Sequence, residues 1–369
     1  MNIPLESIHK PSLLLDETIC RENIRRMAEK ARRLGITFRP HFKTHQSKLI
    51  GRWFREEGVK AITVSSVSMA AYFIEDGWDD LTIAFPLNTR ESSEIINLSA
   101  KAKLNILVTM PETLEPFSGL FKEGRQPIGV FIKIDTGYHR TGLKPSNQDE
   151  IMKIIRICNN NPLLAFKGFL THTGQTYHAS GRKEIETISR EAFRQMVTLK
   201  TRFESRLESL VLSVGDTPAC SLLEDFYGMD EIRPGNFVFY DVMQTVIGSC
   251  DTGNIAVCLC CPVVSKDPPR NEILIYGGAV QLSKESVISE GRIIFGLVCP
   301  LFGRGWSAPL KDCYVSGLSQ EHGIVKVTPE VFSLIRPGEL LGILPVHSCL
   351  TAQCMGAYLV NGDRPADHM

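Results

Sequence analysis

A lysine stands between two histidines near the start of the chain, in the segment FRPHFKTHQ. Lys43 follows a short apolar run by three residues and is flanked by His41 and His45. A lysine held over the mouth of an enzyme barrel loses hydration and can act as an amine nucleophile that forms Schiff bases. The alternative, a solvated lysine in a basic loop, is favoured by composition alone. The other segments with reactive residues therefore determine which interpretation of Lys43 is favoured.

A second segment, LVLSVGDTPA, passes from apolar residues into small polar ones. Ser213, Gly215, Asp216 and Thr217 offer hydroxyl and backbone N–H groups, which suit a bound phosphate in the late loops of a barrel. The alternative is a tight turn in which one of these residues caps a helix. Short glycine motifs have little specificity alone. The place of this segment in the strand pattern is therefore stronger evidence for a phosphate site than its residue types are.

Two arginines also follow apolar runs. Arg140 lies in DTGYHRTG, after Asp135 and between two glycines, and Arg233 lies in EIRPGN. A guanidinium presents a rigid fork of donors that binds an anionic group or a ring oxygen. The alternative for each arginine is an ordinary structural ion pair.

A histidine and a cysteine occur two residues apart in PVHSCLTA. On a strand, His347 and Cys349 would face the same way, and imidazole with thiolate suits Zn²⁺. Two ligands are too few for a closed structural site, whereas a catalytic metal keeps a position open for water or substrate. The alternative is a core histidine beside a buried thiol.

The elements that must position these residues form a repeating pattern. Between residues 36 and 240, eight short β-branched runs alternate with amphipathic stretches. This predicts a parallel sheet and, by its count and size, a (β/α)₈ barrel of the TIM type, whose active site lies at the carboxyl ends of its strands. An open doubly wound sheet is the alternative. The runs are ITFRP, AITVSS, LTIAFP, NILVT, GVFIKID, FKGFLTH, LVLSVGD and, least clearly, IRPGNFVFYD.

After Asp241 the pattern changes to short alternating runs without long helices, which predicts a smaller all-β domain. We therefore expect a barrel domain over residues 1–243 and a C-terminal β-domain over residues 244–369. The first strand, in PSLLLD, can belong to either domain.

Composition excludes several other functions. Lys plus Arg and Asp plus Glu both number 41, so the formal charge is zero and neither nucleic acid nor a membrane is an expected partner. No apolar run approaches the roughly 20 residues of a membrane span, and the first residues do not look like a secretion signal. We expect a cytoplasmic protein in which the 11 irregularly spaced cysteines are mainly buried thiols, Cys349 excepted.

In combination, these segments resemble the D-serine dehydratase and D-threonine aldolase group of fold-type III pyridoxal phosphate enzymes, which are relatives of alanine racemase. The resemblance covers nearly the whole length. The segments that carry it, in chain order, are PSLLLD, RENIRRMA, RPHFKTH, DTGYHRTG, FLTHTGQTY, SVGDTPA, IRPGNFVFYD and PVHSC.

The resemblance implies a role for each segment. Lys43 would bind pyridoxal phosphate covalently, with Arg140 beside the 3′-oxygen of the cofactor and His172 near its ring. Either Tyr177 or Arg233 would contact the pyridine nitrogen. The loops that hold the phosphate would contain Ser213, Gly215, Asp216, Thr217, Gly235 and Asn236.

His347 and Cys349 match the metal pair of D-serine dehydratase, which normally holds zinc; Mn²⁺ and Mg²⁺ are the alternatives. Val346 stands where that family often has asparagine, which removes one source of support around the metal.

The implied reaction is dehydration of a D-3-hydroxy amino acid to a 2-oxo acid and ammonia, with Lys43 as the base at Cα and the metal assisting loss of the β-hydroxyl. The alternatives are retro-aldol cleavage to glycine and an aldehyde, amino-acid racemisation with Tyr276 as a poorly matched second base, and a non-catalytic cofactor carrier. Related enzymes form homodimers, and the resemblance implies the same here.

Overall fold

The computed structural model describes residues 7–120, 126–204 and 209–369, and the chain divides into two compact units. The barrel unit comprises Arg26–Lys43 and Phe54–Gly235. The β unit comprises Met1–Arg25, Thr44–Trp53 and Asn236–Met369. The chain therefore passes from the barrel unit into the β unit directly after Lys43.

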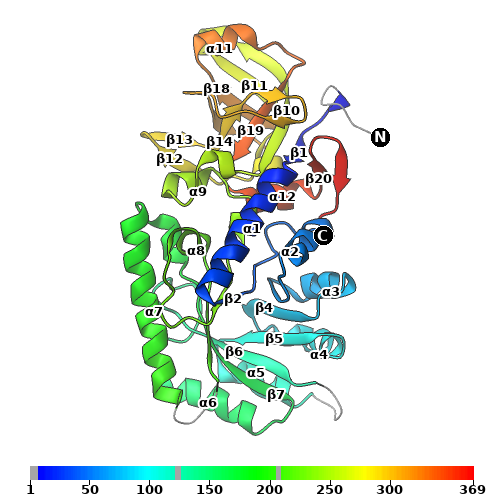
Figure 1. Ribbon diagram of the computed structural model, residues 1–369. Helices are drawn as coiled ribbons and strands as arrows, with labels where there is room; N and C mark the ends of the chain where they lie inside the picture. Colours follow the sequence, from blue (N-terminus) through cyan, green and yellow to red (C-terminus); the bar gives the residue numbers. More distant parts are fainter. Residues whose placement is uncertain (1–6, 121–125, 205–208) are drawn as a thin grey trace. The chain divides into compact units, whose positions relative to one another are not determined.

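The barrel unit is built on eight parallel strands that pair in TIM-like sequence order, β2-β9-β8-β7-β6-β5-β4-β3, as predicted (Figure 1). The eighth strand was predicted over IRPGNFVFYD, but it ends at Ile232 because Pro234 removes a donor and the next residues form a short 3₁₀ turn. The strands are β2 (Thr37–Phe38), β3 (Ile62–Val64), β4 (Asp80–Pro86), β5 (Lys103–Val108), β6 (Ile128–Lys133), β7 (Leu164–Leu170), β8 (Val211–Val214) and β9 (Glu231–Ile232).

Helices follow the strands along the chain. In α6 (Gln148–Asn159) the buried residues are Ile151, Ile154, Ile155 and Cys158, a spacing that places them on one helix face. The other helices of this region are α1 (Glu17–Leu34), α2 (Lys48–Glu56), α3 (Val67–Glu75), α4 (Ser92–Ser99), α5 (Pro111–Ser118), α7 (Arg182–Glu204) and α8 (Thr217–Leu222). Both α1 and α2 continue from one unit into the other.

The core of the barrel unit is formed by buried apolar residues of these strands. All six residues of β6 are buried, as expected for a parallel strand covered on both faces. Leu107, Phe131 and Leu170 form one apolar cluster, contributed by β5, β6 and β7. The polar residues singled out from the sequence therefore follow strands whose bodies are fixed by apolar packing.

The β unit contains a closed six-stranded barrel in the order β10-β11-β18-β17-β14-β19, in which β10 pairs back onto β11. β1 pairs with β10 and with β20, which extends the same sheet. The strands are β1 (Ser12–Leu15), β10 (Val257–Asp267), β11 (Glu272–Tyr276), β14 (Gly296–Cys299), β17 (Tyr314–Leu318), β18 (His322–Lys326), β19 (Leu340–Pro345), β20 (Tyr358–Val360) and β21 (Arg364–Ala366).

Smaller elements complete the β unit. Two hairpins stand outside the main sheet, and four short helices connect its strands. These elements are β12 (Val287–Ser289), β13 (Arg292–Ile294), β15 (Leu301–Phe302), β16 (Gly305–Trp306), α9 (Val242–Ile247), α10 (Ala279–Leu282), α11 (Pro329–Leu334) and α12 (Ser348–Met355). All 11 cysteines are free thiols, and eight of them are buried. Within the described residues, no helix has the length and apolar character needed to cross a membrane.

Candidate functional site

Lys43 follows a firmly anchored residue of the barrel unit. Phe42 is fully buried, with its ring centroid 4.9 Å from those of Phe54 and Phe73 and 5.1 Å from that of Trp78. Its backbone N–H donates to the Thr63 carbonyl at 2.9 Å. The side chain of Lys43 is exposed. An aromatic anchor therefore fixes the backbone from which the exposed side chain of Lys43 projects.

Arg140 lies in a loop that an aspartate organises. Asp135 Oδ1 accepts the backbone N–H groups of Gly137 and His139, both at 3.0 Å, and these bonds hold the pKa of the carboxyl below its usual range although burial raises it. The Arg140 guanidinium lies over the Tyr138 ring, 5.2 Å from its centroid. Arg140 is thus held by its neighbour Tyr138.

Tyr138 in turn contacts His172, the residue predicted near the cofactor ring. The two rings meet edge to face with centroids 5.7 Å apart. His172 Nδ1 donates to the Gly215 carbonyl, which assigns its single proton to Nδ1. Burial, followed by the charge of Lys133, holds the pKa of His172 well below its ordinary value. The structure therefore presents a neutral imidazole with a fixed tautomer.

The VGDT segment forms the turn between β8 and α8. Asp216 caps α8, accepting the Ala219 N–H at 2.7 Å, and it also accepts the hydroxyl of Thr176 at 2.9 Å. The Thr217 N–H donates to Tyr177 Oη at 3.2 Å. The Thr217 hydroxyl is buried and has no partner among the described residues. The capping alternative therefore holds for Asp216, while Thr217 has an unsatisfied group that a bound anion would satisfy.

Arg233 belongs to a buried network beneath this turn. Its Nε donates to Ser213 Oγ at 2.6 Å and its Nη2 to the Thr171 carbonyl at 2.5 Å. Ser213 Oγ donates to Glu231 at 2.6 Å, and Glu231 pairs with Arg39 at 2.6 Å. Arg233 and Ser213 are therefore tied to each other and to the strands.

Lys133 is a residue of this region that sequence reasoning missed. It ends β6 with 5% of its surface exposed, and burial, followed by the charges of Arg233 and Arg140, lowers its pKa to about 7. The signal was present as a single lysine inside the apolar run GVFIKID. A lysine in a strand buried on both faces is rare without a functional or electrostatic reason.

The His-x-Cys pair of the β unit does not lie on a strand, contrary to the prediction. β19 ends at Pro345, His347 is the N-cap residue of α12, and Cys349 lies in the first turn of that helix. The chain turns here because Asp241 Oδ2 accepts the Ser348 N–H at 3.0 Å. The imidazole and the thiol nevertheless hydrogen-bond to each other.

Charge around this pair favours a positive imidazole. Burial lowers the pKa of His347, but the hydrogen bond and charge of Cys349, together with Asp241, raise it to about 9 overall. His347 Nδ1 is buried and has no partner among the described residues. Such a pair is chemically suited to exchange its proton for a cation.

Three further residues lie around the His347–Cys349 pair, and two of them were not identified from the sequence. Asn236 was predicted with the phosphate-binding residues; its amide nitrogen donates to Asp241 at 2.6 Å, to Ser348 at 3.0 Å and to Cys349 Sγ at 3.5 Å. Asp241 and Thr44 were missed, and Thr44 Oγ1 lies 3.2 Å from Cys349 Sγ. Only folding reveals these neighbours, because more than 100 residues separate each from Cys349.

No group of three or more His, Cys, Asp or Glu side chains with metal-binding geometry occurs in the described part of the chain. A metal at His347 and Cys349 would therefore have two protein ligands and would take its others from water or substrate.

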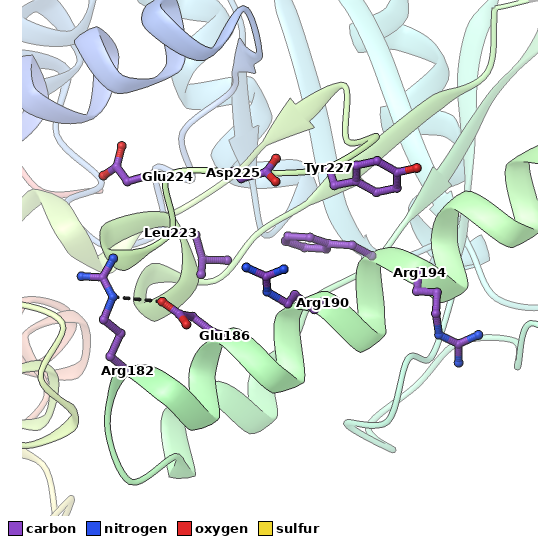
Figure 2. Close-up of a pocket in the computed structure, with 9 residues that line it drawn as sticks. Arg182, Glu186, Arg190, Arg194, Leu223, Glu224, Asp225 and Tyr227 are labelled. Carbon is purple, nitrogen blue, oxygen red and sulfur yellow. Dashed lines mark hydrogen bonds and ion pairs between the residues drawn. The ribbon is translucent and has the colours of Figure 1, made fainter.

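The barrel unit also has a groove of about 370 Å³ between α7 and the segment 223–227 (Figure 2). Arg182, Glu186, Arg190 and Arg194 line it from the helix, and Tyr227 from the opposite wall. None of the residues predicted to carry the chemistry lines this groove, so the candidate site is not located there.

The arrangement of strands, lysine, arginine and histidine in the barrel unit defines an alanine racemase type of enzyme fold, and comparisons with known proteins agree. The family described as alanine racemase, N-terminal domain, matches residues 15–242, and the putative serine dehydratase domain matches residues 256–361. The chain belongs to this fold-type III family of pyridoxal phosphate enzymes, in the group that carries the serine dehydratase domain.

Individual relatives agree over most of the length. The D-serine dehydratase of Dictyostelium discoideum is 30% identical over 393 residues, covering 98% of this chain and 96% of the relative. The solved D-threo-3-hydroxyaspartate dehydratase from Delftia sp. HT23 has a TM-score of 0.91 at 23% identity, covering 100% of this chain and 99% of that one. The D-threonine aldolase of Arthrobacter sp. is 24% identical over 240 residues, covering 64% of this chain and 63% of the relative.

Proposed function

We propose that this chain is a pyridoxal phosphate-dependent and metal-dependent dehydratase of small D-3-hydroxy amino acids, which yields a 2-oxo acid and ammonia. The observation that carries the proposal is the His347–Cys349 pair in a chain whose barrel unit also presents Lys43, Arg140 and His172. The match to a D-serine dehydratase over 98% of the chain supports it.

The residues of the barrel unit fit pyridoxal phosphate. Thr217 has a buried hydroxyl without a partner, His172 is neutral, and Arg140 presents a cation. We assign Lys43 to the covalent attachment, Arg140 to the 3′-oxygen, and Thr217 with Gly215 and Gly235 to the phosphate. Tyr177 and Arg233 both remain proposed for the ring nitrogen. The cofactor supplies a conjugated ring that stabilises negative charge developing at the substrate Cα.

The residues of the β unit fit a divalent metal, which we propose to be zinc because thiolate and imidazole are the ligands it favours. His347 and Cys349 would hold it. The unpartnered Nδ1 of His347 and the buried, unpartnered Oδ1 of Asn236 are groups that an ion or its water ligand would satisfy. The metal would supply a Lewis acid for the departing β-hydroxyl.

The remaining chemistry is assigned to the chain itself. Lys43 takes the proton from Cα, because its amine is accessible and its backbone is fixed by the buried Phe42. Asp241, in contact with Ser348, holds the turn that presents the metal ligands. Within the β unit, Thr44, the residue after Lys43, contacts Cys349.

The finer architecture is also a proposal. We propose that the eight parallel strands close into a complete barrel, supported by the bridge between His41 and Thr63, which joins the two ends of the strand order. We also propose the homodimer that the family resemblance implies. We propose a domain boundary between residues 243 and 244, where the sequence pattern changes.

Aldol cleavage is the second reaction that the same groups could catalyse, since it uses the same base and the same metal-bound hydroxyl. The shorter match to D-threonine aldolase favours dehydration. Product analysis of D-serine and D-threonine incubations, with and without zinc, tests the choice. We expect a keto acid and ammonia to form only when zinc is present. Formation of glycine and an aldehyde would refute dehydration, and turnover that persists after chelation would refute the metal dependence.

A further inference from the structure

The segment between Lys43 and α2 consists of four buried polar residues. Thr44, His45 and Ser47 are completely buried, and Gln46 is 7% exposed. Buried polar groups in a loop require hydrogen-bond partners, because leaving one unpaired costs about 1–3 kcal/mol. The position of this stretch therefore depends on the groups that bond to it.

Partners from outside the segment come from one stretch of the β unit, between Cys349 and Met369. The Tyr358 hydroxyl donates to the His45 carbonyl at 2.6 Å. The Gln46 amide donates to Gln353 Oε1 at 2.6 Å. Gln46 has φ of +44°, a left-handed conformation that a non-glycine residue keeps only where its surroundings enforce it.

Asp367 makes the densest set of contacts with this segment. Its carboxylate accepts the Ser47 hydroxyl at 2.9 Å, the Lys48 N–H at 2.7 Å and the Leu49 N–H at 3.3 Å. Two of these donors are backbone groups of the first turn of α2, which an intrahelical bond cannot satisfy. A negative charge at this end of a helix is also favourable. Asp367 therefore fixes where α2 begins.

We propose that Asp367 and Tyr358 are positioning residues for Lys43. They hold the four residues that follow the lysine, so the chain is fixed directly after its backbone. Neither residue is assigned to cofactor, metal or substrate. The proposal rests on the proposed role of Lys43 as the cofactor-binding lysine.

The test compares Asp367→Ala with Thr328→Ala in the cofactor-loaded, full-length protein. Thr328 caps α11 by accepting the Val331 N–H at 3.4 Å, so its loss removes a helix cap of the β unit that does not contact residues 44–49. Asp367→Ala should lower kcat by about 10- to 100-fold with KM changed less than about twofold, because a misplacement near 1 Å can cost about 10²-fold in rate. It should also shift the pH at which the visible absorbance of the bound cofactor titrates.

Equal kcat and equal cofactor titration in the two variants, at matched thermal stability, would overturn the proposal. Asp367→Asn keeps an acceptor oxygen and should give an intermediate effect, which provides a readout if the alanine variant does not fold. Full activity in Asp367→Asn together with full activity in Tyr358→Phe would also contradict it. Borohydride trapping of the wild type tests the underlying role separately: label on a lysine other than Lys43 would refute the proposed function, whatever the Asp367 variants do.

Discussion

At the scale of single residues, the exposed amine of Lys43 should be indispensable. Replacing it with alanine removes both the covalent attachment and the base, and loss of a general base alone costs about 10²- to 10⁴-fold. We expect Lys43→Ala to lose turnover by at least that factor and to take up no label after borohydride treatment. Peptide mapping checks this, with Lys48→Ala as the control that keeps its label.

Thr217 should contribute to cofactor affinity through its unpartnered hydroxyl. A hydrogen bond to a charged group contributes about 1.5–3 kcal/mol, so Thr217→Val should weaken pyridoxal phosphate binding by about 10- to 100-fold. Thr217→Ser retains the hydroxyl and should bind nearly as the wild type does. Equilibrium dialysis of the apoprotein measures both, and equal affinities in the two variants would remove Thr217 from the phosphate site.

At the scale of elements, the turn from β19 into α12 depends on one buried carboxylate. Asp241 accepts bonds from Asn236, Gln244 and Ser348, so Asp241→Ala leaves several buried donors unpaired. We expect a loss of about 2–4 kcal/mol in the free energy of unfolding. Zinc affinity should fall as well, because the turn presents His347 and Cys349.

The matched variant Asp241→Asn keeps the size and one acceptor oxygen. Its free energy of unfolding should lie between those of the wild type and Asp241→Ala. Denaturant titration and competition with a metal-sensitive dye measure the two effects. An Asp241→Ala protein that unfolds earlier but binds zinc as the wild type does would show that the turn does not position the metal ligands.

At the scale of the whole molecule, two neutral histidines, the buried His45 and the partly buried His172, make the fold sensitive to acid. Burial, followed by the charge of His368, lowers the pKa of His45 to about 3, while the charge of Asp367 and a backbone hydrogen bond with Ser47 act in the opposite direction; burial also lowers the pKa of His172. The unfolded chain takes up these protons near pH 6.5, whereas the folded chain resists them. The free energy of unfolding should therefore fall as the pH drops below about 6.5, by about 1.4 kcal/mol per pH unit for each histidine.

His45→Asn isolates one of these contributions. The asparagine side-chain oxygen can accept the Ser47 N–H that His45 Nδ1 accepts at 3.1 Å, so stability above pH 7 should change little. The slope between pH 4 and 6 should decrease by about 1.4 kcal/mol per pH unit, because one proton fewer is taken up on unfolding. Urea titrations across this pH range measure it, and an unchanged slope would mean that His45 is not kept neutral by the fold.

The sequence by itself determined the eight parallel strands, the β-rich second half and the family. These features depend on apolar periodicity and short motifs, which neighbouring residues along the chain define. Only folding decided that Thr44–Trp53 belongs to the β unit, that Asp241 and Asn236 lie beside the His347–Cys349 pair, and that Lys133 is buried among cations. The tertiary structure also shows that the His347–Cys349 pair lies at the start of α12 and not on the expected strand. Each of these depends on hydrogen bonds or charges between residues distant along the chain, and spacing along a sequence contains no information on such partners until the backbone has brought them together.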